Sequence, residues 1–143
     1  MYLIRPMEVK DIHQVVEVER QSFPMQAQPT AFRHELHKQR SVYLVAYCNS
    51  KFYLSKNHPE FSEKNRFTQL KSVFKYQIKE MSIFSNPKDL IVGFIGSWYV
   101  DDEVHIISLG VRKKVRKRGI GELLLMATME KAKNTDIKTV TLE

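Results

Sequence analysis

Hydrophobic residues recur along this chain at two spacings, one typical of β-strands and the other typical of α-helices. Runs of β-branched and aromatic residues, such as "YLIR" near the start and "SVYLVAYC" further on, predict strands. Between these runs Ile12, Val15 and Val16 form an apolar stripe at helical spacing, which predicts a helix that ends near "SFP". We expect Asp11 to cap this helix, with Gln14 as its capping-box partner.

Further helices and strands alternate along the rest of the chain. The stretch "PTAFRHELHKQR" predicts a second short helix capped by Thr30. "LIVGFIGSWYV" and "EVHIISLGV" predict two strands joined by an acidic turn at Asp101 and Asp102, and so a β-hairpin. An apolar stripe then predicts a helix from Ile120 to about Lys133, and "IKTVTLE" predicts a last strand.

A polar, lysine-rich segment at residues 49–90 interrupts this rhythm. Within it Phe67, Leu70 and Phe74 recur at helical spacing, which predicts an amphipathic helix over about residues 63–84. Its other face carries lysines four residues apart. We interpret it as a surface helix whose lysines face water, with a basic face for an acidic partner or RNA as the alternative. We expect one domain over residues 1–143, with residues 49–90 as an atypical insertion.

Composition fits this picture of one soluble domain. The chain has 143 residues, of which 43% are hydrophobic and 27% charged, as in ordinary globular proteins. The single cysteine, Cys48, excludes an internal disulfide framework and favours a reducing compartment, so we expect a cytoplasmic protein. No apolar run is long enough to span a bilayer, and we expect no membrane partner. The net charge of +7 predicts attraction to an anion such as RNA, the ribosome or a polyphosphate cofactor.

The stretch "VRKKVRKRGIGELLL" carries the strongest chemical signal. It lies between a predicted strand and a predicted helix, so its glycines fall at a helix N-terminus, where backbone N–H groups lack intrahelical partners. Gly119 and Gly121 would let a pyrophosphate approach these N–H groups, and Arg116 and Arg118 would add charge-assisted hydrogen bonds. A bare basic patch or a plain helix start does not explain two glycines in the first turn, because glycine is a poor helix former. We therefore predict a phosphate cradle.

This motif resembles that of the GCN5-related N-acetyltransferase (GNAT) family, in which Arg/Gln-x-x-Gly-x-Gly/Ala holds the pyrophosphate of acetyl-coenzyme A. "IRPMEVKDIHQVVEVERQSFP", "YLVA", "IVGFIGSWYVDDEVHIISLGV", "RGIGELLL" and "TVTLE" occur in order and are similar to the ribosomal-protein-alanine N-acetyltransferase branch. The resemblance implies an α/β fold in which a mixed, mostly antiparallel sheet is flanked by helices. It also implies that the chain ends before the family's C-terminal segment, so that the last strands and a thiolate-protonating tyrosine are missing.

The resemblance also implies which residues form the site. Glu143 matches the general base of the branch, and Glu103 and His105 share one face of the preceding strand, where they are placed to line an amine-binding cleft. The plainer interpretations are a hairpin cap for Glu103 and a satisfied strand histidine for His105. Gly110 suits a strand bulge that exposes backbone N–H groups to the acetyl carbonyl. The implied cofactor-binding residues are Leu109, Gly110, Val111, Arg116, Lys117, Arg118, Gly119, Ile120, Gly121 and Glu122.

The implied activity is direct transfer of an acetyl group from acetyl-coenzyme A to a primary amine, with the N-terminus of a protein such as a ribosomal protein as acceptor. The alternatives are an acetyltransferase for a small amine, such as a polyamine or an aminoglycoside, and a non-catalytic RNA- or ribosome-binding module. Cys48 lies in a buried predicted strand, where a thiol is normally inert, so we expect no covalent acetyl-enzyme. No cluster of residues has metal-ligand spacing, and we expect no metal.

Overall fold

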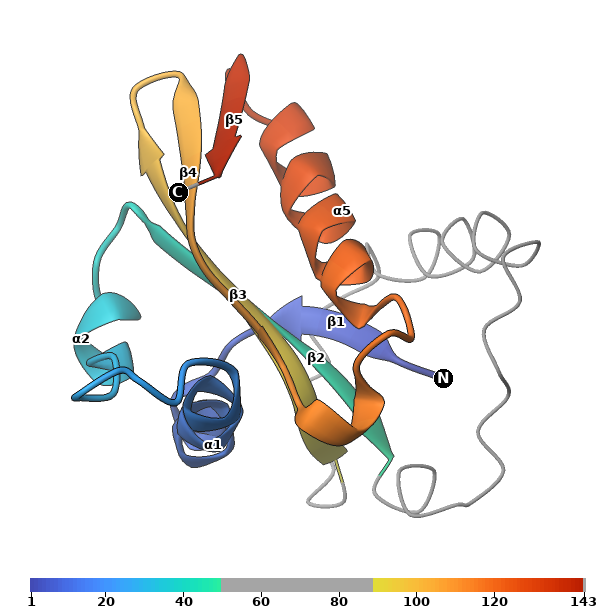
Figure 1. The fold of residues 1–143 in the computed structure, drawn as a ribbon. Helices are drawn as coiled ribbons and strands as arrows, with labels where there is room; N and C mark the ends of the chain where they lie inside the picture. Colours follow the sequence, from blue (N-terminus) through green and yellow to red (C-terminus); the bar gives the residue numbers. More distant parts are fainter. Residues whose placement is uncertain (50–88, 143) are drawn as a thin grey trace.

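The computed structural model describes residues 1–49 and 89–142. The expected amphipathic helix at residues 63–84 and the expected base Glu143 lie outside the described residues. The described part forms a mixed α/β fold, in which one five-stranded sheet lies between helices (Figure 1). This confirms the fold class that the sequence predicts.

The sheet has the strand order β1-β2-β3-β4-β5, so every strand neighbours the next strand in the chain. The first four strands pair antiparallel, whereas β5 pairs parallel with β4 after the crossover through α5. The strands are β1 (Leu3–Pro6), β2 (Ser41–Asn49), β3 (Asp89–Val100), β4 (Glu103–Val111) and β5 (Thr139–Leu142). β3 and β4 form the predicted hairpin, and Asp101 in its turn has a φ of 52°.

Helices cover both faces of the sheet. α1 (Ile12–Ser22) and α2 (Phe32–Glu35) lie on one face, and α5 (Ile120–Lys133) lies on the other (Figure 1). Two short 3-10 turns, η1 (Val9–Asp11) and η3 (Lys113–Val115), precede α1 and α5. The sequence predicts α1 and α5 with nearly these bounds.

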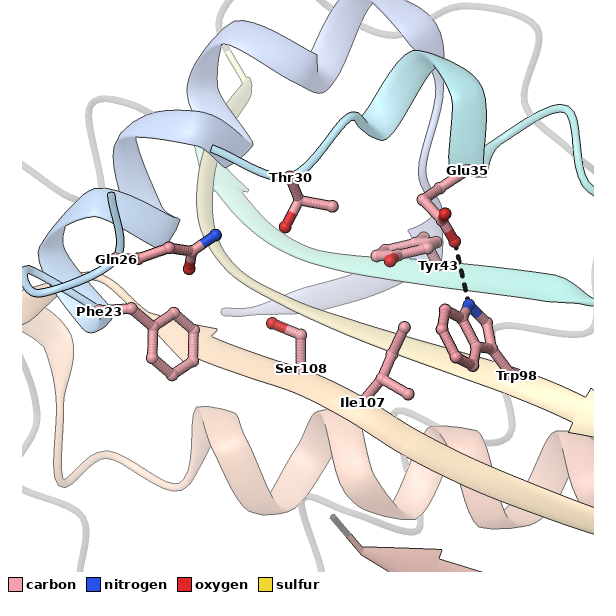
Figure 2. Close-up of a pocket in the computed structure, with 8 residues that line it drawn as sticks. All are labelled: Phe23, Gln26, Thr30, Glu35, Tyr43, Trp98, Ile107 and Ser108. Atoms are coloured by element: carbon pink, nitrogen blue, oxygen red, sulfur yellow. Dashed lines mark hydrogen bonds between the residues drawn. The ribbon is translucent and has the colours of Figure 1, made fainter. Parts of the chain in front are cut away.

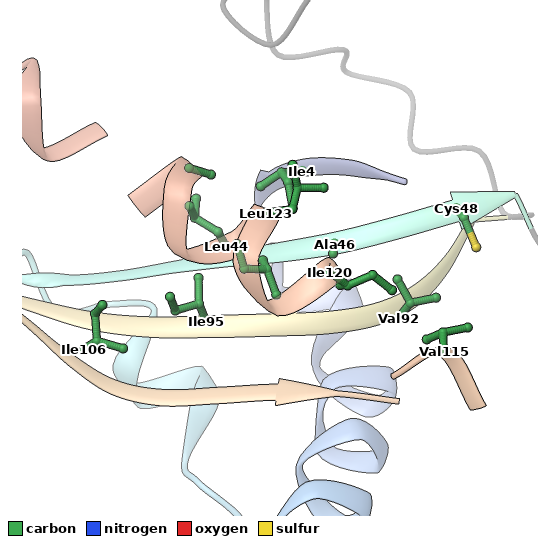
Figure 3. Packing of buried hydrophobic residues seen from close by; sticks show 12 residues of the cluster. Ile4, Leu44, Ala46, Cys48, Val92, Ile95, Ile106, Val115, Ile120 and Leu123 are labelled. Carbon is green, nitrogen blue, oxygen red and sulfur yellow. The ribbon is translucent and has the colours of Figure 1, made fainter. Parts of the chain in front are cut away.

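Each face of the sheet has its own hydrophobic core. Under α5, Ile120 packs with Val92 and Ile95 of the sheet (Figure 3). Under α1 and α2, Val15 and Phe32 pack with Phe94. Complete burial of one such aliphatic side chain contributes about 1.5–3 kcal/mol to the free energy of unfolding. The two cores hold α1 and α5 against fixed positions of the same strands.

Asp11 is the N-cap residue of α1, as the sequence predicts, but its side chain makes no cap hydrogen bond and the predicted capping box with Gln14 is wrong. The Gln14 side chain bonds to β3: its Oε1 accepts the Ile91 N–H at 2.9 Å, and its Nε2 donates to the Asp89 carbonyl. Asp11 is 3% exposed and pairs with both terminal nitrogens of Arg5, at 2.6 and 2.8 Å. The carboxylate also accepts the Glu8 N–H at 2.8 Å, so its charge-assisted bonds go to Arg5 and to the chain before α1, not to the first turn of α1.

The second helix is shorter than predicted, and Thr30 does not cap it. The N-cap of α2 is Ala31, and the helix covers only four residues. The Thr30 N–H donates to the buried Glu19 carboxylate at 2.8 Å, and the Thr30 carbonyl accepts the Phe32 N–H. These two bonds hold Thr30 in a turn before the helix.

Candidate active site

The predicted phosphate cradle has an unusual backbone at the start of α5. Gly119 is the N-cap, with a φ of 79°, and Lys117 has a φ of 63°. The Gly119 carbonyl accepts the first helical hydrogen bond, from Leu123 at 2.9 Å. The backbone N–H groups that follow Gly119 lie in the first turn, where a helix offers them no carbonyl partner. Left-handed residues before a helix start gather N–H groups into an anion-binding concavity.

Gly121 lies where the first turn of α5 meets the end of β4. A Cβ atom on Gly121 would have side-chain atoms of Val111 and Leu109 as its nearest neighbours, at 3.9 and 4.0 Å. The structure therefore brings the predicted cofactor residues of β4 beside those of the helix start. The predicted Lys117, Arg118, Ile120 and Glu122 belong to the same turn and first helical turn.

The arginine side chains of the turn are held by the protein. Arg116 donates to the Val111 carbonyl at 3.0 Å and to the Gln21 carbonyl at 2.9 Å, so it ties the turn to β4 and to α1. Arg118 donates to the Tyr2 hydroxyl at 3.3 Å. Both arginines thus stabilise the shape of the turn while they place positive charge at the start of α5.

The strand bulge lies at Ile107, and the prediction of a bulge at Gly110 is wrong. Gly96 pairs with Ser108 but Ser97 pairs with Ile106, so Ile107 is the extra residue of β4. Position 110 requires glycine for a different reason, which is packing. A Cβ atom there would lie 2.7 Å from Phe94 Cε1, so the close approach of the Phe94 ring requires glycine.

The bulge reverses the alternation of side chains along β4. Before it, Ile106 packs in the α5 core and Ile107 packs against the α1 core. After it, Leu109 again packs against the α5 core, so Ser108 points to the same face as Ile107. Two adjacent residues of one strand therefore lie on the α1 face of the sheet.

A pocket of about 390 Å³ lies on this face, above the bulge (Figure 2). Its floor includes Ile107 and Ser108 of β4, and the loop after α1 forms one side. The opposite side has the α2 carboxylate Glu35 beside Trp98 of β3 (Figure 2). The lining residues are Phe23, Gln26, Thr30, Glu35, Tyr43, Trp98, Ile107 and Ser108. Its volume suits a small ligand or the end of a peptide.

One carboxylate, Glu35, lines this pocket, and the buried Glu19 lies close enough to influence its Tyr43, although the chain carries a net charge of +7. Burial, followed by the charges of Glu35 and Glu19, raises the pKa of Tyr43 well above its usual value. Burial alone would raise the pKa of Glu35, but hydrogen bonds from Lys38, Trp98 and Ser41 outweigh it and lower that pKa. Glu35 therefore stays ionised at neutral pH, and the pocket favours a cationic guest.

The predicted catalytic pair on β4 lies beside the pocket but does not line it. His105 Nε2 lies 3.1 Å from Glu103 Oε2, and its Nδ1 lies 2.9 Å from the Thr141 hydroxyl of β5. Across the ladder His105 pairs with Trp98, which does line the pocket. The two residues thus share one face of β4, as the sequence predicts.

Sequence reasoning missed the residues that give the pocket its charge and shape. Glu35, Tyr43 and Trp98 come from three elements, and no local motif joins them. One local signal was present: Glu35 follows Phe32 by three residues and so shares its buried helix face. An acidic residue at such a position indicates a function or a buried partner.

The described residues contain no group of three or more side chains that could hold a metal ion. Within residues 1–49 and 89–142, no helix is long and apolar enough to cross a membrane.

Known structures share this fold. An aminoglycoside acetyltransferase, meta-AAC0020, from an uncultured soil metagenomic sample matches with a TM-score of 0.63 and 15% identity, over 99% of this chain and 76% of its own. A ribosomal-protein-alanine N-acetyltransferase from Brucella melitensis biovar Abortus 2308 matches with a TM-score of 0.60 and 12% identity, over 99% and 79%. AAC(6')-Iy, in complex with the bisubstrate analogue CoA-S-monomethyl-acetylneamine, matches with a TM-score of 0.59 and 13% identity, over 100% and 79%.

At these identities the structural matches show the fold alone. No curated protein sequence matches the chain. The sequence profile described as "Acetyltransferase (GNAT) family" matches residues 49–143, which include the β3–β4 hairpin, the bulge and the glycine-bearing start of α5. The chain therefore belongs to the GNAT acetyltransferase family, whose members use acetyl-coenzyme A.

Proposed function

We propose that this protein transfers an acetyl group from acetyl-coenzyme A directly to the N-terminal amine of a protein, such as a ribosomal protein. The observation that supports this most is the continuity of β4. Ile107 and Ser108 line the carboxylate-bearing pocket, and Leu109 and Val111 lie against Gly121 at the start of α5. One short stretch of backbone thus connects a site for an amine with a site for a phosphate.

The start of α5 would hold the pyrophosphate of acetyl-coenzyme A. The left-handed Gly119 begins the first turn of α5, whose backbone N–H groups have no carbonyl partner within the helix and would bind the anion. Arg116 keeps this turn against β4. When bound, acetyl-coenzyme A supplies an activated acetyl thioester, and the turn would orient it along β4.

The bulge would receive the acetyl carbonyl. An extra residue in one strand leaves a backbone group out of the ladder, and the extra residue here is Ile107, at the pocket floor. A backbone N–H in this position can stabilise the negative charge that develops on a carbonyl oxygen during acyl transfer. The backbone at Ile107 and Ser108 would thus bind the acetyl carbonyl, whereas the resemblance implies the stretch that follows, Leu109–Val111.

The amine must lose a proton before it attacks the thioester. An α-amine has a pKa of about 7.7–8.0, so a single base acting directly or through a water suffices near neutral pH. Among the residues that the structure describes, His105 is the candidate for this base, because Glu103 and Thr141 orient its ring. Glu143, outside the described residues, remains proposed as a second base.

An acceptor that is part of a protein suits the rim of the pocket. Phe23, at the end of α1, is 38% exposed, and Met25 in the following loop is 94% exposed. Trp98 is 40% exposed on the other side. Exposed apolar side chains around a pocket favour contact with a larger partner. A small polyamine or aminoglycoside acceptor is the second candidate, because the pocket volume and its carboxylate also suit a small cation.

A direct test compares acceptors. The protein is mixed with acetyl-coenzyme A and, in turn, an alanine-initiated peptide, spermidine and an aminoglycoside, and release of free coenzyme A is followed with a thiol reagent. We expect the highest kcat/KM with the peptide, and a loss of about 100-fold in kcat for His105→Gln with little change in KM. A higher kcat/KM for spermidine or the aminoglycoside would overturn the protein-acceptor proposal.

A further inference from the structure

The one carboxylate that lines the pocket, Glu35, is buried and is held by hydrogen bonds from two strands. The Glu35 side chain is 11% exposed. Its Oε2 accepts the Ser41 hydroxyl at 2.9 Å and the Trp98 indole N–H at 3.0 Å, the latter shown in Figure 2. Two neutral donors from β2 and β3 therefore hold Glu35 in one orientation, and neither of them neutralises its charge.

The other oxygen of this carboxylate pairs with a lysine of the same chain. Lys38 Nζ lies 2.5 Å from Glu35 Oε1 and 5.6 Å from the centroid of the Trp98 ring. A carboxylate oxygen beside an aromatic face is the combination that binds ammonium and guanidinium ligands. Lys38 thus lies in a small cation site formed by two residues that line the acceptor pocket.

Lys38 is held weakly compared with Glu35. Its side chain is 43% exposed, and Lys38 does not line the pocket. Because the Lys38 ammonium is partly in contact with water, solvent can rehydrate it when it leaves Glu35, whereas the buried carboxylate keeps its hydrogen bonds to Ser41 and Trp98. A cation that arrives through the pocket can therefore replace Lys38 on a carboxylate that is already oriented.

We propose that Glu35 and Trp98 form a cation subsite of the acceptor pocket, which Lys38 occupies in the structure and from which a second cationic group of the acceptor displaces it. This inference rests on the proposed function, because it specifies the acceptor: beside the amine that is acetylated, it carries another ammonium or guanidinium group. A peptide with a basic residue close to its N-terminus has this chemistry.

Trp98 provides a direct readout. It is the chain's single tryptophan, and both Glu35 and Lys38 contact its ring system, so its fluorescence reports on the subsite. The probes are alanine-initiated peptides with arginine at the second, third or fourth position, each matched by a peptide with neutral citrulline in its place. Binding is measured without acetyl-coenzyme A, so the readout does not depend on catalysis.

We expect at least one arginine peptide to bind about tenfold more tightly than its citrulline partner, the effect of one hydrogen bond to a charged group. Glu35→Gln should remove this preference. Lys38→Met should tighten binding of the arginine peptide several-fold and leave the citrulline peptide unchanged. Lys131→Met is the matched control, because Lys131 is exposed on α5, on the opposite face of the sheet, and should change neither affinity.

The proposal fails if no arginine peptide is preferred, or if Lys38→Met weakens or does not change arginine binding. Should Glu35→Gln fail to fold, the wild-type preference and Lys38→Met decide the question without it. Acetyl transfer to the same peptides separates this inference from the proposed function. No transfer to any peptide overturns the proposed function, whereas transfer with equal KM for the arginine and citrulline peptides overturns only the subsite.

Discussion

Two glycines lie at the start of α5, and their substitution by alanine should have opposite effects on stability. We expect Gly119→Ala to lower the free energy of unfolding and Gly121→Ala to raise it. Gly119 has a φ of 79°, and an L-residue in the left-handed region costs about 1–2 kcal/mol. Gly121 lies inside the helix, and a Cβ atom there meets nothing closer than 3.9 Å. Alanine at such a position stabilises a helix by about 0.5–1 kcal/mol relative to glycine. The two variants should therefore differ by about 1.5–3 kcal/mol.

Urea unfolding followed by circular dichroism measures this difference, and calorimetry with acetyl-coenzyme A measures its consequence for the site. We expect Gly119→Ala to lower both stability and affinity, because relief of the strained φ turns the first-turn N–H groups. Gly121→Ala should raise stability and keep most of the affinity, since the family motif accepts alanine there. Equal changes in stability at both positions would refute the assignment of Gly119 as a left-handed N-cap, and unchanged affinity in Gly119→Ala would refute the phosphate cradle.

Three further substitutions test other parts of the structure by urea unfolding. Asp11→Ala should cost about 3–5 kcal/mol, because it leaves the Arg5 guanidinium without its buried partner. Gly110→Ala should cost about 1–3 kcal/mol through overpacking against Phe94, with no such loss for a control at Gly121. The pKa of Glu35 in the folded protein lies below its ordinary value of 4.5. As the pH falls, the unfolded state therefore takes up the Glu35 proton before the folded state does, which lowers stability. Its contribution to stability should be complete above about pH 5 and be lost as the pH falls through the folded pKa, and Glu35→Gln should remove this part of the acid dependence.

The local pattern was enough to predict the strands, the hairpin and the two long helices. Residues that decide these elements are close in sequence, as in the turn from Arg116 to Gly121 and the apolar stripe of α5. The helix start at Gly119 was predictable for the same reason, because its glycines, charges and helix are consecutive. Phosphate binding there stays a prediction. Structure and profile agree with that interpretation at the level of fold and family.

Contacts between distant residues could not be predicted in this way. Gln14 bonds to a strand 77 residues later, and Trp98 bonds to Glu35 across 63 residues. The position of the bulge depends on how β4 pairs with β3, and the sequence of β4 alone favoured Gly110 over Ile107. A glycine required by packing against Phe94 and a glycine that marks a bulge look the same in a sequence.

The bulge at Ile107 also determines how this protein can be engineered. A library that varies every second residue of β4 from Glu103 onward would change the pocket face as far as Ile107 and then, beyond the extra residue, would enter the core under α5 at Leu109. Selection for a new acceptor would then fail through loss of folded protein. A library that keeps the protein folded takes the extra residue into account. It varies positions 103, 105, 107 and 108, which face the pocket side of the sheet, and keeps 110 as glycine. Positions 104, 106, 109 and 111 face the α5 side and stay apolar.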